Sequence, residues 1–201
     1  MFQFTSSAEE DHQVLIQCLQ QLQQDYSVTP GDLVDFKWKN FSLLHDYSNL
    51  LNRQTLKIQN KNVYILFAEV EREVVGRYDT ILIKEFRFFV VCFLNKSFGH
   101  ILIRKEKLED KINEYFNKTQ LNFPGDDLFN KRFYVLATEE DKALSLLDKN
   151  FRNELVKVDK TENLLVEVVD NLLLICNNKM VDLQSFEELV RLGNNLSTNS
   201  Y

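Results

Sequence analysis

The stretch Asn62–Leu94, NVYILFAEVEREVVGRYDTILIKEFRFFVVCFL, decides the fold of this chain. Apolar and polar residues alternate on both sides of Gly76–Asp79, a pattern typical of two strands joined by a tight turn. We therefore predict an antiparallel hairpin of Asn62–Val75 and Thr80–Leu94. The end of the second strand from Phe88 onward is apolar on both faces, so we expect it to be covered on both sides.

Other elements flank this hairpin. A strand is predicted at Thr55–Gln59, and another at Phe98–Arg104 extends the sheet as an antiparallel meander. At the front, Ser7 and Glu10 fit a helix capping box, and Pro30-Gly31 closes the element. The helix carries one apolar stripe at three- and four-residue steps, made of Leu15, Cys18, Leu19, Leu22 and Tyr26.

The second half of the chain alternates between helix and strand patterns. We predict, in order, a helix at Leu108–Phe116, a strand at Lys131–Leu136, a helix from Thr138 to Leu155 with a kink near Asp148, a hairpin of Asn163–Val169 and Leu172–Cys176, and a helix capped by Asp182 and stopped by Gly193.

These elements define an α+β fold. We expect an antiparallel sheet meander with a long central hairpin, an N-terminal helix and a C-terminal strand–helix–hairpin–helix unit. A single domain is predicted over residues 1–193, with the turn at 123–127 as its candidate subdomain seam. Residues 194–201 are polar and predicted to form a frayed tail.

Composition excludes several classes of protein. The 201 residues are 44% hydrophobic, with five glycines and two prolines, as in folded domains. The net charge of −6 disfavours nucleic acid as a partner, since phosphate binding needs clustered Lys and Arg. Cys18, Cys92 and Cys176 stand apart in apolar runs and predict buried free thiols in a reducing compartment. With neither a signal peptide nor a membrane span in the sequence, we expect a cytoplasmic protein.

Catalytic and metal-binding patterns are absent from the sequence. We predict no enzyme activity, no catalytic residue, no metal site and no cofactor, because no nucleophile–base, metal-ligand or phosphate-loop spacing occurs. A Cys92–His100 pair would need a reactive thiol, whereas Cys92 lies in an apolar run. Carboxylates at Glu69, Glu71 and Glu73 suggest either catalysis or a cross-strand charge ladder in which Glu71 faces Lys84, and we favour the ladder.

Two groups of side chains remain as candidate sites. An interaction surface is predicted at Gln13, Gln17, Gln20, Gln24 and Trp38, and a pocket at His45, Glu71 and His100. The favoured function is a non-catalytic protein-interaction or scaffold domain that binds an unidentified protein or a second copy. The alternative is a domain for a small apolar ligand or lipid, with a cavity lined by some of the 16 phenylalanines.

The segment Asp127–Val135, followed by Leu147, Phe151 and Leu155, resembles a bacterial domain family of unknown function. Phe129, Lys131, Phe133 and Val135 match that family's F-x-K-x-F-x-V strand. The resemblance implies a sheet before this strand, and a helix and short hairpin after it. Members often begin with a membrane-spanning pair, which is not expected here. The family offers no established activity or binding residue to carry over.

Overall fold

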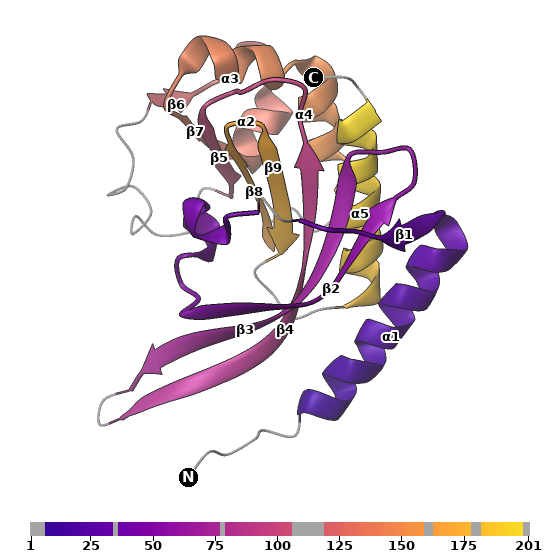
Figure 1. Ribbon diagram of the computed structural model, residues 1–201. Coiled ribbons are helices and arrows are strands. Elements are labelled where there is room, and N and C mark those ends of the chain that lie inside the picture. Colours follow the sequence, from indigo (N-terminus) through magenta and orange to yellow (C-terminus); the bar gives the residue numbers. More distant parts are fainter. Residues whose placement is uncertain are drawn as a thin grey trace.

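The computed structural model describes residues 7–33, 36–76, 79–105, 119–158, 163–177 and 182–198, with side chains of the first helix from residue 13 onward. Nine strands in this part of the chain form a single antiparallel sheet, shown in Figure 1. They are β1 (Val28–Pro30), β2 (Asn49–Ile58), β3 (Val63–Val75), β4 (Thr80–Phe93), β5 (His100–Arg104), β6 (Thr119–Leu121), β7 (Tyr134–Ala137), β8 (Leu164–Val169) and β9 (Leu172–Asn177).

Helices lie on one face of the sheet, and a loop with two short 3-10 helices lies on the other. The α-helices are α1 (Ser7–Asp25), α2 (Asp127–Arg132), α3 (Glu140–Leu146), α4 (Lys149–Val156) and α5 (Leu183–Thr198); the 3-10 helices are η1 (Trp38–Asn40) and η2 (Ser42–Leu44). The predicted α+β fold is confirmed. The predicted helix at 108–116 lies outside the described residues, as do the side chains of the predicted capping box.

The predicted central hairpin is confirmed as β3 and β4. The two strands pair without a break from Val63↔Cys92 to Val75↔Thr80. In Figure 1 the turn end of this hairpin extends to the lower left, away from the rest of the sheet. The predicted Thr55–Gln59 strand is also present, although it begins earlier, because β2 runs from Asn49 along the side of β3.

Strand order differs from a simple meander beyond β4. The order is β1-β2-β3-β4-β9-β8-β5-β7-β6, so the β8–β9 hairpin separates β4 from β5. Backbone bonds hold this insertion, since Leu94 N donates to Asn171 O at 2.8 Å and Phe98 N donates to Asp170 O at 2.9 Å. The apolar end of β4 thereby pairs with β9, a strand that is also buried on both faces.

Both faces of β4 near its end are buried, as predicted. On the helix face, Phe88 and Val90 join the larger core, where the Phe88 and Phe186 rings stack edge to face at 5.0 Å. On the other face, Phe89 and Val91 join a second core, closed by Phe41 and Leu44 from the loop with the 3-10 helices. The stripe of α1 packs on the first core, with Cys18 and Leu22 buried and the other three residues half-buried against it.

Two predicted elements around residue 140 are wrong in detail. Lys131 and Arg132 form the last turn of α2, not the start of a strand, because the Asp126 carboxylate accepts from Phe129 N and starts a helix there. The strand begins only at Tyr134. The predicted kinked helix is two helices, since Asp148 caps α4 by accepting from Phe151 N at 2.8 Å. The predicted Asp182 cap is confirmed, with Ser185 N donating at 2.8 Å.

The prediction that Gly193 ends the last helix is wrong, because α5 continues through residues 194–198. The glycine instead permits close packing of α5 on β4. A Cβ atom at Gly193 would lie 2.4 Å from Val90 Cγ1 and 3.4 Å from Cys92 Sγ. The Cys92 thiol donates to the Gly193 carbonyl at 3.6 Å, so the helix backbone rests directly on the strand.

We predict that Gly193→Ala lowers the free energy of unfolding. Overpacking of about 1–3 kcal/mol exceeds the gain of about 1 kcal/mol from replacing a helical glycine with alanine. Urea unfolding followed by circular dichroism measures the change, with Glu187→Ala at an exposed position of α5 as the control. An unchanged or higher midpoint for Gly193→Ala would contradict this account of the glycine.

Candidate interaction surface

The turn end of the β3–β4 hairpin is a two-stranded ribbon. Strand β2 accompanies β3 only as far as the pair Asn49↔Glu71, and β9 accompanies β4 only over Val90–Phe93. Beyond Glu71, no strand in the described part of the chain pairs with either side of the hairpin. We call residues 72–76 and 79–83 the hairpin tip.

Four large apolar side chains of the hairpin tip are exposed to solvent. Val75 is 78% exposed and Ile81 53%, and Val74 and Leu82 are also exposed. Val74 pairs with Ile81 across the two strands, while Val75 and Leu82 lie on the opposite face. The tip therefore presents apolar groups on both faces. Isolated exposed apolar residues are common, whereas a group of four at one projecting end is a candidate contact surface.

The charges next to the tip are paired with one another. Lys84 Nζ lies 2.6 Å from Glu71 Oε1 and 3.8 Å from a Glu69 oxygen, which confirms the predicted ladder. The hydrogen bond from Lys84 holds the pKa of Glu71 below its usual value. On the other face, Arg72 from β3 lies 2.7 Å from Glu85. These carboxylates are occupied by neighbouring cations and have the arrangement of a charge ladder, not of an acid–base pair.

The predicted glutamine surface and Trp38 lie on opposite faces of the sheet. Gln13, Gln17, Gln20 and Gln24 are exposed on α1, which packs on the helix face. Trp38 is half-buried in η1, against the core of the other face. It starts a 3-10 helix and not a strand. The five residues therefore do not form one continuous surface.

The three residues of the predicted pocket have separate partners. His45 is exposed, and its Nε2 lies 2.9 Å from the Lys39 carbonyl oxygen. Glu71 bonds Lys84, and His100 Nε2 lies 2.5 Å from Glu167 Oε1. Each side chain thus belongs to a different local network.

Cys92 and His100 do not form a dyad. Cys92 belongs to the core beneath the helices, whereas His100 bonds Glu167, whose other partners belong to the opposite face. Burial raises the pKa of the Cys92 thiol to about 12, which keeps it protonated. Cys18 and Cys176 are also buried and free, as predicted.

A fully buried carboxylate, Glu167, is the polar centre that the sequence analysis missed. It stands on β8 and is 0% exposed. It accepts three hydrogen bonds from the start of η2, from Ser42 N at 2.9 Å, Ser42 Oγ at 2.7 Å and Leu43 N at 2.9 Å. With His100 as a fourth neighbour, its lone pairs are satisfied. The signal in the sequence was a single acid within the apolar run Leu164–Val169.

This Glu167 cluster holds the loop that contains η2. The Ser42 hydroxyl donates to Glu167 and not to His100, so the arrangement is not a serine–histidine pair. The carboxylate has no exposed surface from which to meet a substrate. Its three bonds to η2 instead fix the loop that covers the second core.

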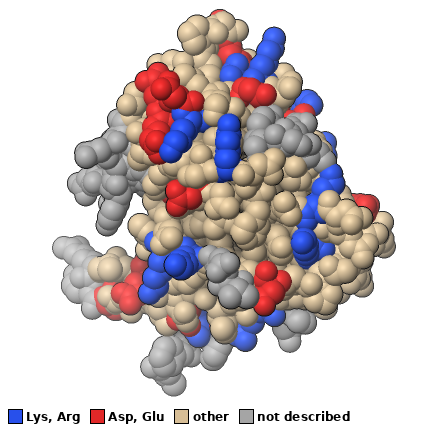
Figure 2. Space-filling model, turned by 45° about the horizontal axis from the view of Figure 1, so that its top comes forward, with Lys and Arg blue, Asp and Glu red and all other residues tan. Residues whose placement is uncertain are grey.

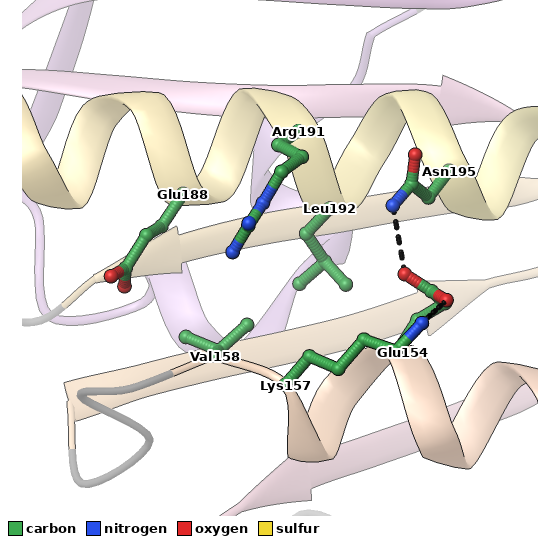
Figure 3. Close-up of a pocket in the computed structure, with 7 residues that line it drawn as sticks. All are labelled: Glu154, Lys157, Val158, Glu188, Arg191, Leu192 and Asn195. Atoms are coloured by element: carbon green, nitrogen blue, oxygen red, sulfur yellow. Dashed lines mark hydrogen bonds and ion pairs between the residues drawn. The ribbon is translucent and has the colours of Figure 1, made fainter.

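A small groove lies between α4 and α5, as Figure 3 shows. Its volume is about 190 Å³, below the roughly 300 Å³ at which ligand pockets begin. Glu154 stands in it as a hydrogen-bond acceptor from Asn195 at 2.8 Å and from Lys157 at 2.5 Å. Glu188 and Arg191 add charge along the helix. A polar groove of this size does not accommodate a long apolar chain.

Charges of both signs are scattered over the surface. Figure 2 shows basic and acidic side chains interspersed on one face of the molecule, with uncharged areas between them. Among the described residues, no cluster of His, Cys, Asp and Glu has the composition of a metal site. In the same part of the chain, no helix is long and apolar enough to cross a membrane.

Comparison with known proteins identifies a related fold but no family. No protein-family model matches the chain, and no curated protein matches it. The crystal structure of the mycobacterial trehalose monomycolate transport factor A, TtfA, is similar, with a TM-score of 0.58 at 9% sequence identity. The similarity covers 96% of this chain and 94% of that one. At this identity the match shows a shared fold alone.

We predict that Glu167→Gln lowers the free energy of unfolding by about 2–4 kcal/mol. The amide nitrogen of glutamine is a donor and cannot replace a carboxylate oxygen that faces Ser42 or Leu43 N–H groups. Urea unfolding measures the loss. Glu71→Gln is the matched control and changes stability much less, because its ion pair lies at the surface and is screened by water. Equal losses in the two variants would contradict the role given to Glu167.

Proposed function

We propose that this chain is a non-catalytic protein-interaction domain that docks through its hairpin tip. The observation that carries the proposal is the exposure of Val74, Val75, Ile81 and Leu82 at the projecting end of a ribbon. Because their burial would remove apolar surface from water, these side chains favour association with another protein. The glutamine face of α1 is a second, more polar contact region in this proposal.

The rest of the molecule supports a role without catalysis. The carboxylates beside the hairpin are paired, Glu167 is occupied by a loop, and the described cysteines are buried thiols. Free thiols are typical of a reducing compartment, so the proposal places the protein in the cytoplasm. We also propose that the chain is related to the bacterial domain family of unknown function that it resembles.

Lipid or apolar-ligand binding is the second candidate function. The observation in its favour is the fold shared with a protein described as a trehalose monomycolate transport factor. The interior offers less support, because the aromatic rings fill space against one another. Phe129 lies 5.2 Å from Phe123 and 5.1 Å from Phe133, and Phe67 lies 5.8 Å from Phe186. Native mass spectrometry of the freshly purified protein tests for a co-purified apolar mass, which would favour this candidate over the first.

The docking role of the tip is tested with the double variant Val74→Ser, Ile81→Ser. A photo-crosslinking residue at Val75 identifies the protein partner, which is then purified and titrated against each variant. We expect the double variant to weaken binding by at least about tenfold, because apolar anchors dominate interface energies. The fold is retained, since the replaced side chains are exposed.

The matched control for this experiment is Leu128→Ser, Leu144→Ser. These two leucines are 54% and 41% exposed and lie on α2 and α3, away from the hairpin. The control should bind as the wild type does. If the control and the tip variant lose affinity equally, or if neither does, the hairpin tip is not the docking surface.

A further inference from the structure

The outer edge of β4 is long and open in the part of the chain that the structure describes. No strand among the described residues pairs with its Thr80–Phe89 side, because β9 begins at the pair Val90↔Ile175. On the other side of the hairpin, the outer edge of β3 is free only beyond Glu71. Unpaired edges of this length are templates for strand addition.

The hydrogen-bond pattern shows which residues face outward along this edge. Gly76 N donates to Asp79 O at 2.7 Å, and Phe93 N donates to Asn62 O at 2.9 Å, so these two are bonded pairs. Bonded and non-bonded pairs alternate along an antiparallel ladder. The residues in non-bonded pairs with β3 direct their N–H and C=O groups to the open edge, and these are Thr80, Leu82, Lys84 and Phe86.

Two charged residues that would guard this edge, Lys84 and Glu85, have partners on β3. Lysine on an edge strand normally opposes strand addition. Lys84 Nζ instead lies 2.6 Å from Glu71 on β3, and Glu85 lies 2.7 Å from Arg72 on the same strand. The open side of β4 is left flanked by Ile81, Leu82 and Ile83, of which the first two are exposed.

Charge favours one register among those centred on Leu82, Ile83, Lys84 and Glu85. Because outward residues must pair with outward residues, the centre of an antiparallel pairing between two β4 edges can lie at any one residue of the strand. A pairing centred on Lys84 or on Glu85 would place like charges opposite each other. Centring on Leu82 places Asp79 opposite Glu85 of the second copy. Centring on Ile83 places the two Ile83 side chains together, Lys84 opposite Leu82 and Glu85 opposite Ile81 of the second copy, so that no like charges face each other.

We propose that two copies of this chain associate through their β4 edges, antiparallel and centred on Ile83, to form a continuous sheet. This inference deepens the proposed function and rests on it, since it names a second copy as the partner of the hairpin. The exposed Ile81 and Leu82 of each copy flank the shared axis. A self-complementary edge of this kind gives a closed two-fold dimer.

Disulfide crosslinking tests the proposal and its register. Ile83 of each copy would form a non-bonded pair, in which the Cα atoms lie about 4.5 Å apart, within the range that a disulfide spans. The native cysteines are buried and do not interfere. In the full chain, Ile83→Cys should give a crosslinked dimer under mild oxidation. Val74→Cys, on β3, and Ile81→Cys, which lies opposite Glu85 of the second copy, should not.

Charge swapping supplies an independent readout. Sedimentation equilibrium of the wild type should show a concentration-dependent dimer, and Ile83→Lys and Ile83→Glu should each weaken it by about tenfold or more. An equimolar mixture of the two variants should restore dimerisation, because Lys and Glu then meet at the axis. Thermal unfolding checks that both variants fold.

A monomeric wild type, crosslinking at Ile81→Cys in place of Ile83→Cys, or failure of the mixture to recover would overturn the proposal. If the wild type is monomeric but the tip variant Val74→Ser, Ile81→Ser still loses a different protein partner, the proposed function survives without the dimer. If the wild type is monomeric and the tip variant loses no protein partner, the proposed function fails as well.

Discussion

The apolar end of β4 is the constraint on which the rest of the structure depends. Residues 88–92 are buried on both faces, so this strand needs a cover above, a cover below and an apolar neighbour at its side. Helix α5 covers one face, with its glycine in contact with Val90 and Cys92. The loop with η1 and η2 covers the other face, and β9 supplies the neighbouring strand.

The loop with η1 and η2 is held in place by a buried carboxylate. Residues 36–47 contain two single-turn 3-10 helices, which have little stability of their own. Glu167 fixes them by accepting three hydrogen bonds from Ser42 and Leu43, and His100 is its fourth hydrogen-bonding neighbour. A carboxylate buried in this way is costly unless its lone pairs are satisfied. The polar cluster and the apolar core of this face therefore stabilise the same loop.

Local pattern was sufficient for the hairpin, its register, the burial of both faces of β4 and the cap at Asp182. Each of these follows from residues close in sequence. The insertion of β8–β9 beside β4 was not predictable in this way, because many apolar strands could pair there. Glu167 escaped notice for the same reason, since its partners at Ser42 lie 125 residues away. Gly193 was misread because a glycine near a helix end and a glycine at a helix–strand contact look alike in sequence.

The same architecture explains why recognition is expected at the ribbon and not on the sheet. Both sheet faces near the centre are covered, and a group of exposed apolar side chains remains where β3 and β4 extend past their neighbours. The charges that keep this ribbon in solution are paired between its two strands, Lys84 with Glu71 on one face and Glu85 with Arg72 on the other. Because these pairs satisfy each other within the hairpin, a strand that arrives at the edge of β4 does not have to break them. The proposed strand pairing on the β4 side is therefore compatible with the ion pairs that join the two strands of the ribbon.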